Sequence, residues 1–268
     1  MSIEYTSDGR VVTITINRPQ VRNALDLPHF AALAAAWKRF RDDDEAWVAI
    51  VTGVEDTFCV GADLKSFVPA VTERIDGLVA GDAATFEEFP ADAGMVAVLR
   101  EFDLFKPVIA AVNGLCVAGG MELLGGCDIR IAAEGAQFGV VEPRRGLFAG
   151  GGTTVRLPRQ IAFAHAMEML LLAERLPAQR ALEMGVVNAV VDRASLLDEA
   201  HSWAERICVN APLAIRATKE SVLKGLSLSM HDAYAYELDC AARVFATDDA
   251  VEGPRAFAEK RPPVWQGR

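Results

Sequence analysis

Two glutamates and two glycine-rich turns are the residues of this chain best suited to chemistry. Glu122 follows the pair Gly119-Gly120 inside a strongly apolar stretch, and Glu142 comes later, directly before Pro143. Because apolar surroundings make an ionised carboxylate costly, a protein that keeps carboxylates there usually uses them. The pattern indicates acid/base chemistry beside a polarised carbonyl group.

The glycine turn ahead of Glu122 predicts a helix over residues 119–126 that follows a strand ending at Val112. The first turn of a helix has unpaired N–H groups and a partial positive charge. The Gly119 N–H is therefore a candidate donor to a developing oxyanion. The structural alternative is a turn in which Glu122 only stabilises the helix dipole.

A second turn, FCVGADLK over residues 58–65, closely follows the predicted strand WVAIV at 47–51. Gly61 frees the backbone there, so the Ala62 N–H is a candidate second donor. Two converging donors stabilise an enolate-like oxygen, at about 3–4 kcal/mol per donor in known cases. Asp63 in the same turn suits a capping role as well as a catalytic one.

The composition limits the classes of partner and site. The chain has 268 residues, 51% of them hydrophobic, which suits one domain or a domain with an appendage. A net charge of −10 argues against nucleic acid or an anionic membrane as the main partner. We see no signal peptide or membrane-spanning run. Five cysteines without a CxxC pair predict free thiols, buried at Cys116 and Cys127, in a reducing cytoplasm, and the four histidines have no metal-ligand spacing.

Strands that alternate with helices predict an α/β layer fold. The predicted strands cover 10–17, 47–51, 107–112 and 129–133, and the predicted helices of this part cover 27–42 and 119–126. Residues 66–103 are less regular and suggest a lid or pocket wall. Helical patterns then follow at 160–172, 177–183, 195–209, 212–225, 229–245 and 248–259. An apolar stripe on the helix 229–245 indicates core packing or a subunit contact.

The chain resembles the crotonase family, the enoyl-CoA hydratases and isomerases, from about Val11 to Lys260. The resemblance rests on the order and spacing of NRPQVRNAL (17–25), FCVGADLK (58–65), KPVIAAVNG (106–114), AGGMEL (118–123), CDIRIA (127–132), FGVVE (138–142), the following GGGTTVRL and FATDDAVEGPRAFAEKR (245–261). It implies an α/β spiral of ββα units over residues 1–195, with the CoA site and the active site. It also implies a helical region over 196–268 that forms a homotrimer, often paired into a hexamer, and completes the active site.

The resemblance implies an enoyl-CoA hydratase, which adds water syn across the C2=C3 bond of a trans-2-enoyl-CoA. By position, the N–H groups of Ala62 and Gly119 form the oxyanion hole, and Glu122 and Glu142 are the catalytic pair. Substrate and CoA contacts carried over by position are Arg22, Ala24, Val60, Leu64, Lys65, Gly150, Phe257 and Lys260. The two lysines have an ordinary alternative as exposed surface residues. CoA is part of the substrate, and no separate cofactor or metal is expected.

Other readings stay open at this point. A Δ3-Δ2-enoyl-CoA isomerase can work with one carboxylate, and a specialised acyl-CoA dehydratase would use the same pair. The chain also departs from the family pattern, with Val141 before Glu142, Ala149 in place of a proline and Thr153 in place of a glycine. A non-catalytic RNA-binding or scaffold member is disfavoured by the charge and by both glutamates. A serine or cysteine hydrolase lacks a visible nucleophile with a histidine partner.

Overall fold

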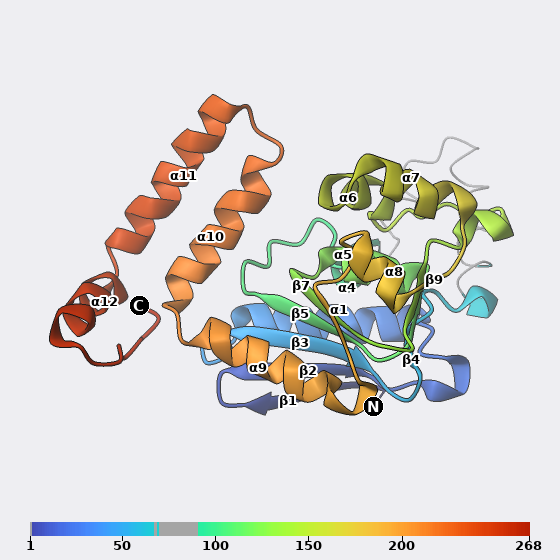
Figure 1. Ribbon diagram of the computed structural model, residues 1–268, viewed down its shortest axis with the longest axis horizontal. Helices are drawn as coiled ribbons and strands as arrows, with labels where there is room; N and C mark the ends of the chain where they lie inside the picture. Colours follow the sequence, from blue (N-terminus) through green and yellow to red (C-terminus); the bar gives the residue numbers. More distant parts are fainter. Residues whose placement is uncertain (1, 67–68, 70–90) are drawn as a thin grey trace.

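The chain forms a mixed α/β structure built on two sheets (Figure 1). The computed structural model describes residues 2–66, 69 and 91–268. The larger sheet has six strands in the order β1-β2-β3-β5-β7-β10, parallel except for the β1–β2 pair. Its strands are β1 (Ile3–Asp8), β2 (Val11–Ile16), β3 (Val48–Gly53), β5 (Val108–Val112), β7 (Ile129–Ala133) and β10 (Ala189–Val191).

A smaller sheet has four strands in the order β4-β6-β8-β9. They are β4 (Thr57–Cys59), β6 (Leu115–Val117), β8 (Gln137–Gly139) and β9 (Leu176–Pro177). β4, β6 and β8 each follow directly after a strand of the larger sheet, so the chain passes from one sheet to the other in successive turns. This passage, with helices between the turns, confirms the predicted α/β spiral.

The central strands of the larger sheet are buried on both faces. Every residue of β3 and β5 is buried. One face packs in the main core with α1 (Leu27–Asp42), which buries Trp37 and Phe40. The other face is covered by α9 (Leu196–Cys208), whose Leu196, Ala200 and Ala204 share a second apolar cluster with the strands. Burial on both faces explains why these strands read as continuous apolar runs.

The last three helices leave the sheets. α10 (Pro212–Gly225) and α11 (Met230–Phe245) lie side by side and extend outward with α12 (Asp248–Glu259) (Figure 1). Along α11 the apolar stripe is exposed, since Met230, Tyr234, Leu238 and Phe245 are each more than half accessible. The predicted boundary after residue 195 falls at the start of α9, which packs on the larger sheet. The division into two regions therefore stays a prediction.

Several elements differ from the sequence expectation. The predicted helix 160–172 is α7 (Phe163–Leu172), and α6 (Thr153–Gln160), which was not predicted, precedes it. The strands of the smaller sheet were not predicted because two or three residues show no periodicity. Further α-helices are α4 (Ala91–Ala97), α5 (Gly119–Gly126) and α8 (Ala178–Glu183). Most of the expected lid at 66–103 lies outside the described residues. Among the helices that the structure describes, none is long and apolar enough to cross a membrane.

Candidate active site

Two backbone turns meet at the start of α5 (Gly119–Gly126). A Cβ atom at Gly119 would lie 2.8 Å from the Cα of Gly61 and 3.6 Å from the nitrogen of Ala62. Gly61 has a φ of +84°, a region that glycine enters without strain. The contact of the two turns therefore depends on glycine at both positions.

The N–H groups of Ala62 and Gly119 have no hydrogen-bond acceptor among the residues that the structure describes. The neighbours of Ala62 are held instead, because Leu25 donates to the Gly61 carbonyl and Asp63 donates to the Leu25 carbonyl, each at 2.8 Å. Two adjacent free N–H groups on a fixed backbone suit the binding of a partly negative oxygen.

Glu122 lies in the first turn of α5, with its carboxylate held by the next glycine loop. The Gly151 N–H donates to Oε1 of Glu122. A Cβ at Gly151 would lie 2.2 Å from Oε2, so this approach requires glycine. Burial raises the pKa of Glu122, and the Gly151 N–H and the charges of Arg156 and Arg100 oppose that rise. Glu122 is thus a half-buried carboxylate whose pKa rise is partly offset by these groups.

Glu142 begins the short 3-10 helix Glu142–Arg145 and is buried. Its Oε2 is enclosed and has no hydrogen-bond partner among the described residues. Burial, together with the charge of Glu122, raises the pKa of Glu142 to about 7. A carboxyl that titrates near neutral pH can both give and take a proton at working pH. The structure therefore brings together the two N–H groups and the two glutamates that the sequence singled out.

The turn 18–26 and the turn 58–65 are joined beside this site. Leu25 and Ala62 form a parallel bridge, and Arg18 reaches Asp63 at 3.1 Å and Asp26 at 2.9 Å. Asp63 therefore has a structural role, since it also accepts the Lys65 N–H at 3.2 Å. Five of the proposed CoA-binding positions lie on these two turns: Arg22, Ala24, Val60, Leu64 and Lys65.

The remaining three positions are divided between two places. Gly150 is exposed in the loop that holds Glu122, and its carbonyl accepts a hydrogen bond from Arg100. Phe257 and Lys260 are exposed on α12 and at its end. Figure 1 shows α12 well away from α5, so a single chain does not bring these two residues to the site.

The comparisons with known proteins agree with this arrangement. The family described as enoyl-CoA hydratase/isomerase matches residues 6–268. The chain belongs to the enoyl-CoA hydratase/isomerase family. It is 38% identical to an enoyl-CoA hydratase of Mycobacterium tuberculosis over 97% of this chain and 94% of that protein. It is 39% identical to the carnitinyl-CoA dehydratase of Salmonella paratyphi B over 100% of this chain and 99% of that protein. An enoyl-CoA hydratase structure from Bacillus anthracis has a TM-score of 0.88 at 34% identity, covering 100% of both chains.

Membership in the enoyl-CoA hydratase/isomerase family makes the chain an enzyme, and the two relatives named above are hydro-lyases. Sequence reasoning missed the partners of Glu122. The three glycines at 150–152 signalled a close approach, but they did not show that the Gly151 N–H meets this carboxylate. Arg156 stands in the segment GGGTTVRL, where nothing in its spacing pointed to Glu122.

Proposed function

We propose that this protein adds water syn across the C2=C3 bond of a trans-2-enoyl-CoA to give a 3-hydroxyacyl-CoA. The observation that carries the proposal is a pair of N–H groups without a partner among the described residues, beside the half-buried Glu122 and the buried Glu142, whose pKa is raised to about 7. An oxyanion site alone would suit many reactions of thioesters. The second, protonatable carboxyl favours a reaction that needs an acid and a base together.

In this mechanism the thioester oxygen accepts hydrogen bonds from the Ala62 and Gly119 N–H groups, which polarise the conjugated double bond. Glu122, as carboxylate, takes a proton from water while the hydroxide oxygen bonds to C3. Glu142, as carboxylic acid, gives its proton to C2. A proton then returns from Glu122 to Glu142, so that one water is consumed and the enzyme is restored. The protein groups supply all of this chemistry, and no cofactor beyond the CoA moiety of the substrate is invoked.

The test is loss of the enoyl-thioester absorbance across trans-2-enoyl-CoAs that are short, long and branched. We expect hydration of at least one, and loss of most of it in Glu122→Gln. Glu168→Gln, on α7, is the matched control because that glutamate pairs with Arg180 at 3.1 Å, apart from the site. Turnover of no enoyl-CoA by the wild type would refute the proposal.

Two alternatives use the same residues. The identity to a protein named carnitinyl-CoA dehydratase supports the reverse reaction on a specialised hydroxyacyl-CoA. A Δ3-Δ2-enoyl-CoA isomerase would move a proton between C2 and C4 without consuming water. Product analysis in H₂¹⁸O separates the isomerase from the hydro-lyases, because only reversible addition of water places the label at C3.

The proposed pH dependence follows from Glu142. Its pKa of about 7 lies above the ordinary value of 4.5. Hydration needs the protonated form and should decline as the pH rises through about 7, whereas dehydration needs the ionised form and should increase. The free energy of unfolding should fall with rising pH, as the hydration rate does. The native state holds this proton more tightly than the unfolded state, so it loses stability as the pH rises toward 7. Glu142→Gln should therefore melt higher than the wild type at pH 8 and equally near pH 4, and equal melting at pH 8 would contradict this reasoning.

We also propose the CoA contacts given above, with Phe257 and Lys260 reaching a neighbouring subunit's CoA, and a cytoplasmic location. Five free cysteines, four of them buried, suit a reducing compartment. The proposed assembly is a homotrimer or a pair of trimers. Its support is the exposed apolar stripe of α11, since monomeric proteins seldom expose a large continuous apolar patch.

Charge on that stripe should weaken the assembly. Leu238 is 69% exposed in the single chain, so Leu238→Glu is expected to shift the mass seen by light scattering toward the monomer. Asp239→Lys, at an exposed polar position one residue on, is the matched control and should keep the wild-type mass. A wild-type protein that is monomeric at micromolar concentration would contradict the proposal.

A further inference from the structure

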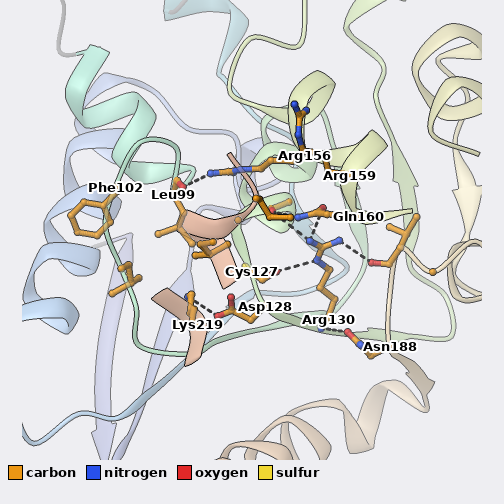
Figure 2. Close-up of a pocket in the computed structure, with 17 residues that line it drawn as sticks. Leu99, Phe102, Cys127, Asp128, Arg130, Arg156, Arg159, Gln160, Asn188 and Lys219 are labelled. Carbon is orange, nitrogen blue, oxygen red and sulfur yellow. Dashed lines mark hydrogen bonds and ion pairs between the residues drawn. The ribbon is translucent and has the colours of Figure 1, made fainter. Parts of the chain in front are cut away.

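A cavity of about 450 Å³ lies at the C-terminal end of α5, the helix that carries Glu122, and is also lined by residues of α6 and α10 (Figure 2). Three arginines line it: Arg130, Arg156 and Arg159. Arg130 is occupied by the protein itself, because it donates to the Gln160 side chain at 2.8 Å and to three main-chain carbonyls. Such bonds favour a structural role for the cavity wall over capture of an outside anion.

Arg156 differs from its neighbours in what it joins. It leaves α6, and its Nη1 donates to the Val98 carbonyl at 3.0 Å and to the Glu122 carbonyl at 3.2 Å. Its Nη2 donates to the Leu99 carbonyl, a contact drawn in Figure 2. The guanidinium of Arg156, a residue of α6, therefore contacts both α5 and the turn that follows α4.

The segment 151–156 contacts Glu122 twice, once at its side chain and once at its main chain. The Gly151 N–H binds its carboxylate, and Arg156 binds its carbonyl. Arg156 has no carboxylate within ion-pair distance among the described residues, and burial lowers its pKa. Burying a guanidinium without a carboxylate partner costs free energy, and hydrogen bonds to neutral carbonyls offset only part of that cost.

We propose that Arg156 is a positioning residue, which fixes Glu122 against Gly151 and joins it to the turn at Val98 and Leu99. The inference rests on the proposed function, in which Glu122 is the base. The guanidinium touches no reacting atom in this scheme. It acts through the placement of the Glu122 backbone and through its own charge.

The charge of Arg156 also acts on the proton affinity of Glu122. Within the described part of the chain, the ionisable groups that interact with that carboxyl are Arg156, Arg100, Glu142 and Cys59. The two arginines lower the pKa of Glu122 against the larger effect of burial. Removing the Arg156 charge should therefore move the titration of Glu122 to higher pH.

The experiment compares Arg156→Met and Arg156→Lys with Arg159→Met in the full-length protein. Arg159 lies on the same helix and lines the same cavity. It is exposed, and it donates a hydrogen bond to the Val155 carbonyl at 2.7 Å within its own helix. Two quantities are measured: the Glu122 titration, by NMR of ¹³C-labelled glutamate carboxyls assigned with Glu122→Gln, and kcat for the enoyl-CoA that the wild type hydrates best.

In Arg156→Met we expect Glu122 to titrate at higher pH. We expect kcat to fall about a hundredfold, which is the effect of a displacement of about 1 Å at a catalytic group. Arg156→Lys should return the titration toward the wild type without restoring kcat, because an ammonium cannot span the same carbonyls. Arg159→Met should match the wild type in both. If Arg156→Met does not fold, kcat of the lysine variant decides the question.

The proposal is overturned if Arg156→Met matches Arg159→Met in titration and in kcat, or if the folded lysine variant keeps the wild-type kcat. The titration needs no turnover. A wild type without hydratase activity therefore counts against the proposed function alone, and the effect of Arg156 on Glu122 is still measured.

Discussion

Replacement of Glu142 with glutamine is expected to lower kcat for hydration by about 10²–10⁴-fold, the usual contribution of a positioned acid or base. Glutamine keeps the shape of the side chain but has no proton to give to C2. The buried Oε2 of Glu142 has no hydrogen-bond partner among the described residues, and the pKa of Glu142 is raised to about 7, so the carboxyl is poised for this transfer. The measurement is the loss of enoyl-thioester absorbance at saturating substrate.

The control for this substitution is Glu174→Gln. Glu174 is exposed and pairs with Arg144 at 3.3 Å on the outer side of the same region. It should hydrate at the wild-type rate. If Glu142→Gln hydrates as fast as Glu174→Gln, Glu142 does not supply the proton and the assignment of the pair is wrong. Retention of KM in Glu142→Gln would further indicate that the carboxyl acts in the transition state and contributes little to substrate binding.

Sequence patterns predicted the longer elements closely. The helices 27–42, 119–126, 212–225 and 248–259 have the bounds that the sequence patterns indicated. The structure adds a cap at the start of α1, where Asp26 accepts the His29 N–H. The smaller sheet was missed because its short strands are defined by their partners, as when Cys116 of β6 pairs with Phe138 of β8. Such pairing is a property of the spiral and not of either segment alone.

The candidate site shows the same division. Residue type and context singled out Glu122, Glu142 and the two glycine turns, because buried carboxylates and free N–H groups are unusual in apolar sequence. The support of Glu122 was not predictable in this way. Its two holding contacts come from Gly151 and Arg156, which reach it only because α6 returns to the start of α5. A side chain that binds main-chain carbonyls leaves no trace in residue spacing, so this part required the structure.

Replacement of Gly119 with alanine is expected to lower kcat by about 10²–10³-fold, the usual cost of losing one oxyanion donor. The new Cβ would lie 2.8 Å from the Cα of Gly61, a contact with backbone that cannot turn aside. The two turns must therefore separate, and the N–H groups of Ala62 and Gly119 can no longer meet one oxygen. The rate should be measured together with binding of a saturated acyl-CoA.

Gly125→Ala, in the same helix α5, is the matched control. A Cβ there would make its nearest contact at 3.5 Å, with the Cδ atom of Arg156, which is ordinary packing. Alanine also has the better helix propensity, so this variant should keep activity and melt at or above the wild-type temperature. A folded Gly119→Ala protein that binds the acyl-CoA and turns over like Gly125→Ala would remove Gly119 from the oxyanion hole. A loss of kcat with acyl-CoA binding retained would place its N–H where negative charge develops, because such a donor acts more on the transition state than on the bound thioester.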